Sequence, residues 1–489
     1  MVDVTIVGAG PVGLWAAGEL ARRGVDVVVL EKLDRPSPYS KALTIHPRTL
    51  EVFAQRGMAQ EAIDVGVRVP DGHFANLDNR MAFAVLDTPY AFTLKYSQED
   101  TEILLERAAR ALGADIRREH EAIEVTDKGD VVITKVRSGD STYLVESEYL
   151  IGADGARSLV RDAVGIAFEG TRSTYWGMLG DVVLDSPPDR PVFSVSTEQG
   201  GIMLSPLARG GLTRIVGTSA ALPAGNELTF EQFRGAVVDI AGTDFGMRDP
   251  VWLSRYGNAA KIASSYRAGR VFLAGDAAHI HLPAGGVGMN VGIQDAANLA
   301  WRLADVVHGL APDSVLDRYA AERRQVGLDL LLATQAQSAL MSTYTADGLA
   351  LRALISEFIA TIPEFSKVLA ERLSGLSVKY ALPGHSLAGS RAPDLPLVGV
   401  VATLFEALHA AQPVVVAAPG VVNDTTAAKL RERGISTYIR AYQTRAEWAD
   451  VTAALIRPDG YVAWATEAEE LRARDEVLGA AAQLRPGIG

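Results

Sequence analysis

The chain has 489 residues, no cysteine, and a net charge of −12 from 47 lysines and arginines against 59 aspartates and glutamates. The missing thiols exclude disulfides, cysteine-ligated zinc or iron–sulfur centres, and thiol nucleophiles. The acidic balance argues against nucleic acid or an anionic membrane as a partner, because both favour clustered basic residues. The length predicts two to four domains of roughly 100–200 residues each.

The first residues predict a buried strand rather than a targeting signal. Residues 4–7 are Val-Thr-Ile-Val, whereas a secretory signal needs a basic region followed by an apolar one. The sequence contains no apolar run of about 18 residues, so we expect no transmembrane helix. We therefore expect a cytoplasmic protein.

A glycine-rich motif follows this strand. Gly8, Gly10 and Gly13 have the G-x-G-x-x-G spacing, and they precede a predicted helix over about residues 12–23 and a second buried strand that ends at Glu31. Gly8 suits a tight turn, Gly10 the close approach of a pyrophosphate, and Gly13 the packing of helix on strand. The pattern predicts an adenine dinucleotide site with Glu31 on the ribose, but it does not separate FAD from NAD.

Two later segments also place an aspartate directly after a buried strand. Asp154 is one, and Asp276 is the other, followed by a glycine-rich turn over residues 283–290 and a helix to about residue 308. Such an aspartate can accept hydrogen bonds from ribityl or ribose hydroxyls. The turn exposes N–H groups at a helix N-terminus, which favour an electron-rich oxygen such as that of a reduced flavin. An enzyme that uses only NAD does not need this second half-site, so the pair favours FAD.

The rest of the chain divides into three regions. Residues 176–269 alternate apolar and polar positions, with one helix near 229–241, and predict a sheet. Residues 315–380 are predicted to be helical, with a packing stripe, and residues 385–489 show a βαβ rhythm. The stripe residues are Leu316, Tyr319, Leu328, Leu331 and Leu332; the predicted strands span 177–183, 191–195, 201–204, 213–217, 414–418 and 435–439, and a helix spans 425–433.

The three motifs, in this order, resemble the fingerprints of the class A flavoprotein aromatic hydroxylases, which are single-component FAD monooxygenases. The resemblance covers roughly residues 1–380. Within that family the chain is similar to bacterial hydroxylases of polyketides and antibiotics: anthracycline, angucycline and tetracycline-pathway hydroxylases and rifampicin monooxygenase. This narrower match rests on residues 40–43, 48–51, 241–246, 252–255 and 457–464.

The resemblance implies an α/β fold of the para-hydroxybenzoate hydroxylase type. A discontinuous Rossmann-like FAD domain would comprise residues 1–175 and 270–380, with the substrate sheet of residues 176–269 inserted into it. Residues 385–489 would form a thioredoxin-like domain, which cannot exchange thiols because it has no cysteine.

The resemblance also implies the cofactor-binding residues by position. Two departures stand out: Lys41 replaces an arginine common in relatives, and Val287 replaces a glutamine. Lysine lacks the bidentate fork of arginine. The implied cofactor-binding residues are Gly8, Gly10, Pro11, Val12, Gly13, Glu31, Lys32, Lys41, Gln98, Asp154, Gly155, Asp276, Gly286, Gly288, Met289 and Asn290.

The implied reaction uses NADPH or NADH to reduce FAD, and O2 to form a flavin C4a-hydroperoxide that hydroxylates a bulky polycyclic phenol or quinone. The cofactor carries the difficult step, so no side-chain catalyst is required. Arg48 is one candidate for facing the active site, and His279 and His281 are more often structural than proton shuttles at such positions. No histidine or carboxylate cluster predicts a metal. Pocket and core positions are both open for Tyr175, Trp176, Met203 and Phe193, and Pro283 is a further candidate for the substrate site.

Other outcomes remain open at this point. Baeyer–Villiger insertion and epoxidation use the same fold, and a non-catalytic flavin- or drug-binding protein is a candidate from another class. The chain lacks the W-x-W-x-I-P motif of tryptophan-type halogenases and the cysteine pair of disulfide reductases. The substrate, the choice between NADPH and NADH, and the choice between monomer and homodimer are not fixed by the sequence.

Overall fold

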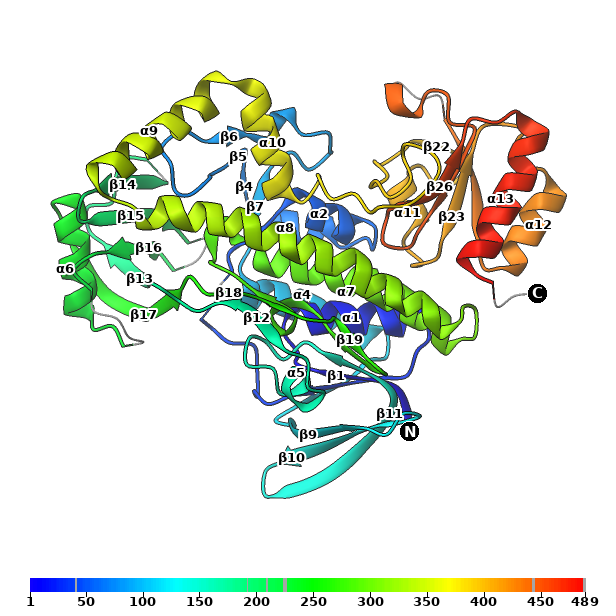
Figure 1. The fold of residues 1–489 in the computed structure, drawn as a ribbon, viewed down its shortest axis with the longest axis horizontal. Coiled ribbons are helices and arrows are strands. Elements are labelled where there is room, and N and C mark those ends of the chain that lie inside the picture. Colours follow the sequence, from blue (N-terminus) through cyan, green and yellow to red (C-terminus); the bar gives the residue numbers. More distant parts are fainter. Residues whose placement is uncertain (40–41, 191, 208–209, 223–226, 442–444, 487–489) are drawn as a thin grey trace.

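The computed structural model describes residues 1–39, 42–190, 192–207, 210–222, 227–441 and 445–486. Figure 1 shows a sheet of residues 176–257 at one end of the long axis, the C-terminal residues at the other end, and a larger sheet with long helices between them.

The largest sheet carries the three predicted motifs at the ends of its parallel strands. β1 pairs in parallel with β2 and β11, and β11 pairs in parallel with β20. The central strands are apolar on both faces, as expected for a covered parallel sheet. The order is β19 (Arg267–Ala268), β20 (Val271–Leu273), β11 (Ser141–Gly152), β1 (Val2–Val7), β2 (Val27–Glu31) and β8 (Asp115–Arg118), with β10 (Val132–Ser138) and β9 (Glu121–Asp127) added antiparallel to β11.

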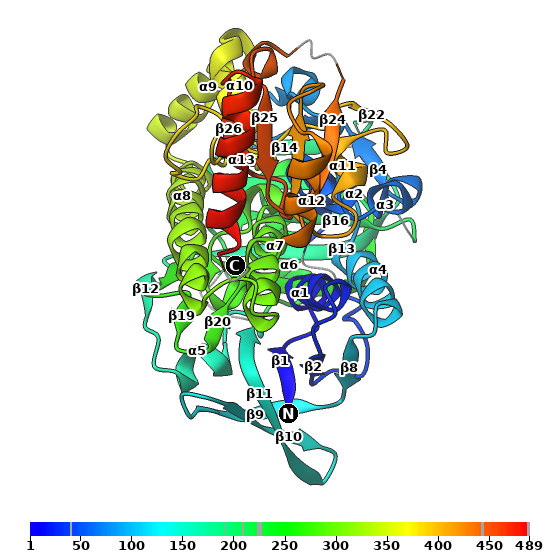
Figure 2. The same ribbon diagram turned by 90° about the vertical axis from the view of Figure 1, so that its right-hand side faces the viewer.

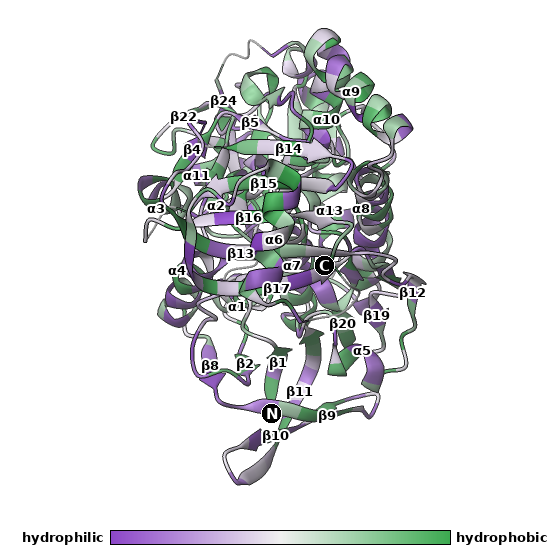
Figure 3. Ribbon diagram, turned by 90° about the vertical axis from the view of Figure 1, so that its left-hand side faces the viewer, coloured by the Kyte–Doolittle hydropathy of each residue, from purple (hydrophilic) through white to green (hydrophobic). Residues whose placement is uncertain are grey.

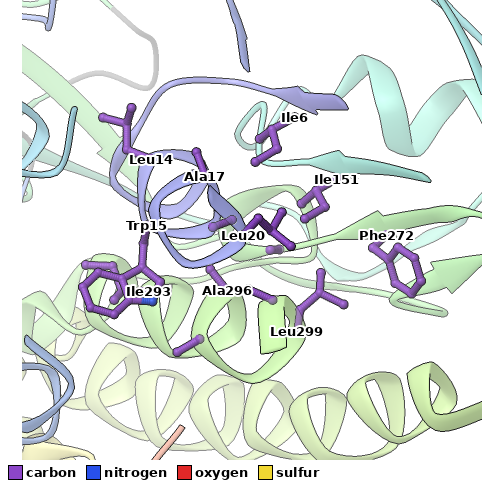
Figure 4. Close-up of a cluster of buried hydrophobic side chains, with 14 of the residues drawn as sticks. Ile6, Leu14, Trp15, Ala17, Leu20, Ile151, Phe272, Ile293, Ala296 and Leu299 are labelled. Carbon is purple, nitrogen blue, oxygen red and sulfur yellow. The ribbon is translucent and has the colours of Figure 1, made fainter. Parts of the chain in front are cut away.

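Helices α1 (Pro11–Arg22) and α7 (Gly288–Val307) cover one face of this sheet and form the centre of the core. Figure 4 shows Leu20 of α1 between Ile151 of β11 and Leu299 of α7, all three in the buried cluster. A methyl group on Gly292 of α7 would lie 2.6 Å from Val12, so glycine permits the close approach of the two helices. The helices and strands predicted for the first motif and for the turn before α7 are confirmed, with ends shifted by one or two residues.

The second sheet is antiparallel and confirms the strands predicted between residues 177 and 217 where they are described. Helix α6 (Phe230–Ala241), which begins with a capping box at Thr229 and Gln232, lies across its outer face (Figure 3). Strand β17 was not predicted, because Pro250 and charged neighbours interrupt its alternation. The order is β14 (Phe193–Thr197), β15 (Gly200–Pro206), β16 (Thr213–Ser219), β13 (Trp176–Leu184) and β17 (Met247–Gly257).

Short strands and further helices connect the two sheets. The region predicted as helical holds three helices, but its stripe is only partly buried: Leu328 and Leu332 of α8 are 37% and 64% exposed. The remaining strands are β3 (Thr44–Ile45), β4 (Val67–Val69) and β7 (Thr93–Lys95); β5 (Asp71–Gly72) and β6 (Met81–Ala82); and β12 (Phe168–Thr171), β18 (Ala260–Ala263) and β21 (His279–Ile280). The helices are α2 (Pro47–Ala54), α3 (Ala59–Val65), α4 (Gln98–Ala111), α5 (Leu159–Ala163), α8 (Asp317–Ser342), α9 (Ala346–Thr361) and α10 (Pro363–Ser374), with 3-10 turns at Phe83–Val85, Gly275–Ala277, Ala284–Gly286, Asp313–Leu316 and Ala446–Trp448.

The C-terminal sheet has a parallel βαβ unit followed by an antiparallel pair and a last helix, which is the predicted thioredoxin-like topology. Figure 2 shows α12 and α13 side by side on its outer face. The order is β22 (Leu397–Val398), β24 (Ser436–Arg440), β23 (Val414–Ala417), β25 (Ala453–Ile456) and β26 (Val462–Thr466), with helices α11 (Leu404–Ala407), α12 (Asp424–Glu432) and α13 (Glu470–Leu484). The exact domain boundaries stay a prediction.

Buried ion pairs join the C-terminal residues to the rest of the chain. Asp305 of α7 accepts hydrogen bonds from Arg23 at 2.5 Å and from Arg485 at 2.8 Å, and the three side chains are at most 2% exposed. Glu322 of α8 pairs with Arg302 and Arg457. Burial raises the pKa of Glu322, but the two guanidinium charges outweigh it and hold that pKa at about 2. Removing one partner of such a set leaves a buried charge unpaired.

We expect Asp305→Asn to destabilise the protein, because Arg23 and Arg485 would then be buried without a counter-charge. The loss in free energy of unfolding should be about 3–5 kcal/mol, measured by urea denaturation. Asp185→Asn is the matched control, since Asp185 pairs with Arg248 on the surface and should barely move the midpoint. Equal midpoints for the two variants would contradict this role of Asp305.

Candidate active site

A cavity of about 830 Å³ lies where the carboxyl ends of β1 and β11 face the second sheet. Gly10, Pro11 and Val12 line one part of it, and residues of β13, β15 and β16 line another. Ten further residues from the predicted set and the neighbouring turns line the space between: Gln98, Gly155, Ala274, Asp276, Pro283, Ala284, Gly285, Gly286, Gly288 and Met289.

The first glycine-rich loop has the geometry of a pyrophosphate cradle. Gly8 has φ +104°, and a Cβ there would lie 2.4 Å from the carbonyl oxygen of Ala153. A Cβ on Gly13 would lie 2.0 Å from the carbonyl oxygen of Gly8, whereas one on Gly10 would meet no atom within 4 Å. Gly10 is also the N-cap of α1 and supplies no side-chain cap, so the first N–H groups of the helix are available to an anion. These residues fit the phosphates of a dinucleotide.

Glu31 is fixed beside this loop at the end of β2. Its carboxylate accepts hydrogen bonds from the backbone N–H of Ala9 at 2.8 Å and of Leu33 at 2.9 Å. Each carboxylate oxygen has a second lone pair for a ribose hydroxyl. Lys32 is exposed, and Lys41 lies outside the described residues.

The carboxylate of Asp154 has one oxygen without a hydrogen-bond partner among the described residues. Asp154 Oδ2 accepts from the N–H of Val160 at 3.1 Å, while the buried Oδ1 has no hydrogen-bond partner among the described residues. Burial raises the pKa of Asp154. A buried polar atom without a partner is costly, so a ligand hydroxyl or amide is a suitable partner. Asp276 differs: its carboxylate is exposed and lines the cavity.

Asn290 holds the second glycine-rich turn from behind. Its Oδ1 accepts from the N–H of His46 at 2.8 Å, and its Nδ2 donates to the carbonyls of Thr44 and Gly286 at 3.0 Å. It is 2% exposed and does not line the cavity, so the structure places it as a support of the turn rather than as a wall residue. Val287 is also buried outside the lining, which explains why a side chain without polar atoms is tolerated there.

Three other candidates for the active site also do not line the cavity. Arg48 is fully buried, donates to Glu51 at 2.8 Å and to the carbonyl of Asp459 at 2.7 Å, and so faces the C-terminal residues. Tyr175 accepts a hydrogen bond from Ser338 and packs in a neighbouring cluster. Trp176 begins β13 outside the lining. Met203 and Pro283, in contrast, line the cavity.

The two histidines near the third motif differ. His279 is fully buried and binds Asp295 at 2.8 Å, and Asp295 also accepts from the N–H of Gly275 and from Arg323. His279 is therefore structural and helps to fix the turn that carries Asp276. His281 lines the cavity, and burial lowers its pKa, which favours the neutral ring.

Sequence reasoning missed a polar wall of the cavity. It is formed by residues on or near β5, β6, β7, β13, β15 and β16, which carry no recognisable motif. Its members are Asp71, His73, Arg80, Lys95, Asp181, Ser205 and Arg214. Within the described ranges, no three metal-ligating side chains lie together. None of the described helices has both the length and the hydrophobicity of a membrane span.

Gly10→Ala should weaken flavin binding, because its methyl group would enter the space left for the pyrophosphate. We expect the steric overlap to cost about 1–3 kcal/mol of binding free energy, which corresponds to roughly 10- to 100-fold weaker affinity. Fluorescence titration with FAD measures this affinity. Gly235→Ala is the matched control, since Gly235 also has open space around it but lies on the exposed side of α6. Unchanged affinity in the Gly10 variant would remove the loop from the cofactor site.

Burial of Glu102 makes the stability of the fold depend on pH. It lies behind Gln98, which donates to it at 2.8 Å, and burial raises its pKa from 4.5 to about 7. The protonated form is favoured in the folded chain, so its stabilisation is complete below pH of about 4.5 and is lost as the pH rises through about 7. Glu102→Gln should therefore exceed the wild type in stability above that range by about 1–3 kcal/mol, measured by urea denaturation.

The control for Glu102 is Glu146→Gln, at an exposed position on β11. It should leave the pH dependence of unfolding unchanged. A Glu102→Gln variant with the same pH dependence as the wild type would contradict the buried, protonated carboxyl.

Comparisons with known proteins agree with this geometry. A family model described as FAD binding domain matches residues 1–350, and one described as aromatic-ring hydroxylase, C-terminal, matches residues 385–484. The chain is 38% identical over 478 residues to rifampicin monooxygenase of Streptomyces venezuelae, covering 96% of this chain and 97% of that protein. The structure of OxyS anhydrotetracycline hydroxylase from Streptomyces rimosus superposes with a TM-score of 0.90 at 36% identity, covering 99% of both chains.

One relative is named for a different activity. Dialkyldecalin synthase of Streptomyces rugosporus is 37% identical over 480 residues, covering 96% of this chain and 97% of that protein. The likeness to the hydroxylases nevertheless extends over both family models and over the whole fold. The chain belongs to the FAD-dependent aromatic-ring hydroxylases, a family of flavoprotein monooxygenases.

Proposed function

We propose that the protein is a monooxygenase that uses FAD, NADPH or NADH, and O2 to hydroxylate a bulky polycyclic aromatic polyketide or antibiotic. The observation that carries this proposal is the continuous cavity of about 830 Å³, which joins the glycine-rich loop to the second sheet. Cofactor and substrate would therefore share one enclosure. Relatives named for rifampicin and anhydrotetracycline support a large, multi-ring substrate.

The residues divide the work between binding and exclusion of water. Gly10 and the N-terminus of α1 would hold the phosphates, Glu31 the adenosine ribose and Asp276 the ribityl chain, with Gly286 and Met289 against the flavin ring. Bound FAD would supply hydride acceptance and oxygen activation. The apolar side chains of Leu179, Met203 and Val216 face the same space from the second sheet, where they can orient a flat ring and keep water out.

Two alternative functions are consistent with the same cavity. Oxygen insertion beside a carbonyl, or epoxidation, needs the same cofactor and the same enclosure. The synthase relative favours a second candidate class, in which the chain binds flavin and a polyketide-like ligand without oxidising it. Consumption of NADPH and the mass of the product separate these cases.

The test is a turnover assay with the flavin-loaded protein and a panel of polycyclic phenols and quinones. We expect at least one compound to increase NADPH oxidation about 10-fold or more over the rate without substrate, since substrate positioning typically contributes at least that factor. Mass spectrometry should show one added oxygen atom. An added oxygen with ring opening would indicate Baeyer–Villiger insertion. Ligand binding without any NADPH or NADH oxidation would contradict the monooxygenase proposal.

A further inference from the structure

Lys95 places an ammonium group inside the cavity. It lies at the end of β7, is half-buried, and donates to the hydroxyl of Ser205 on β15 at 2.8 Å. Within the described part of the chain, Lys95 forms no ion pair with a carboxylate at 4 Å or less. Two other cations of this wall are neutralised: Arg80 by Asp71 at 2.5 Å and Arg214 by Asp181 at 2.7 Å.

The surroundings of Lys95 disfavour its charged form. Burial lowers the pKa of Lys95, and the nearby charge of Arg80 lowers it further, although Asp71 acts in the opposite direction. Burial, with Arg80 again contributing, lowers the pKa of His73 to about 3, so this cavity-lining ring is neutral at physiological pH. The buried Nδ1 of His73 has no hydrogen-bond partner among the described residues. An anion in this space would offset the cost of the desolvated ammonium.

We propose that Lys95 recognises an ionised oxygen of the substrate, a phenolate or an enolate, and thereby selects acidic polycyclic phenols and hydroxyquinones. The inference rests on the proposed function and names the chemistry of its substrate. An ammonium has three N–H donors, and Ser205 uses one of them, so two remain for the ligand. A hydrogen bond between two charged groups is about twice as strong as a neutral one, which makes it suited to selection.

The test compares two small ligands of the same shape on the oxidised, flavin-loaded protein without NADPH. The probes are 2-hydroxy-1,4-naphthoquinone, which is an anion at neutral pH, and 2-methyl-1,4-naphthoquinone, which is neutral. Isothermal titration calorimetry should show about 10- to 100-fold tighter binding of the anion by the wild type. Lys95→Met should lose this preference by weakening only the anion, and Lys95→Arg should retain most of it.

Controls separate recognition from folding and from cofactor binding. Lys429→Met removes an exposed lysine on α12 and should leave both affinities unchanged. FAD affinity should be the same in Lys95→Met and in the wild type, and the thermal midpoint of the variant should be no lower, because the desolvated ammonium is removed. If Lys95→Met instead loses FAD affinity, or weakens both quinones equally, the ammonium serves the cofactor or the fold, and the proposal is overturned.

The comparison of the two quinones on the wild type alone also tests the proposal. Equal affinity for the two quinones would overturn the proposal even if no Lys95 variant folded. This failure is distinguishable from failure of the proposed function, because the binding test needs no turnover, whereas the turnover assay would still show whether NADPH is oxidised and oxygen is added.

Discussion

The close approach of backbone segments at the carboxyl edge of the main sheet is the constraint on which the site depends. Gly8 and Gly13 lie so near to Ala153 and to each other that any Cβ would overlap a carbonyl oxygen. This contact sets where β1, β11 and α1 meet, and it leaves Gly10 facing open space. The cavity begins at that point because the strands end together there, as ligand sites in open α/β sheets do.

A second level of support comes from buried polar groups rather than from the cavity wall. Asn290 ties the second glycine-rich turn to β3, and Asp295 ties the turn carrying Asp276 to α7 and to Arg323. The ion pairs around Asp305 and Glu322 then attach the C-terminal residues to the same helices. The C-terminal residues therefore contribute to the rigidity of the helices behind the site without lining the cavity.

The parts that the sequence predicts well are those fixed by local rules. Glycine spacing and strand-end aspartates place Gly10, Gly155 and Asp276 at the cavity, and the apolar strands identify the sheet that carries them. Arg48 and Tyr175 could not be placed, because each is positioned by residues more than 150 positions away in the chain. Lys95 and Arg80 lie on or beside strands of two or three residues, whose approach to β15 and β16 is a tertiary property.

The most direct measurement of the central claim is a crystal structure of the FAD-loaded protein with a polycyclic phenol or hydroxyquinone. The account predicts flavin density along Gly10, Asp276 and Gly286, with ligand density in the same cavity against β15 and β16. Ligand density outside this cavity, or flavin held elsewhere, would contradict the claim that one enclosure holds both molecules.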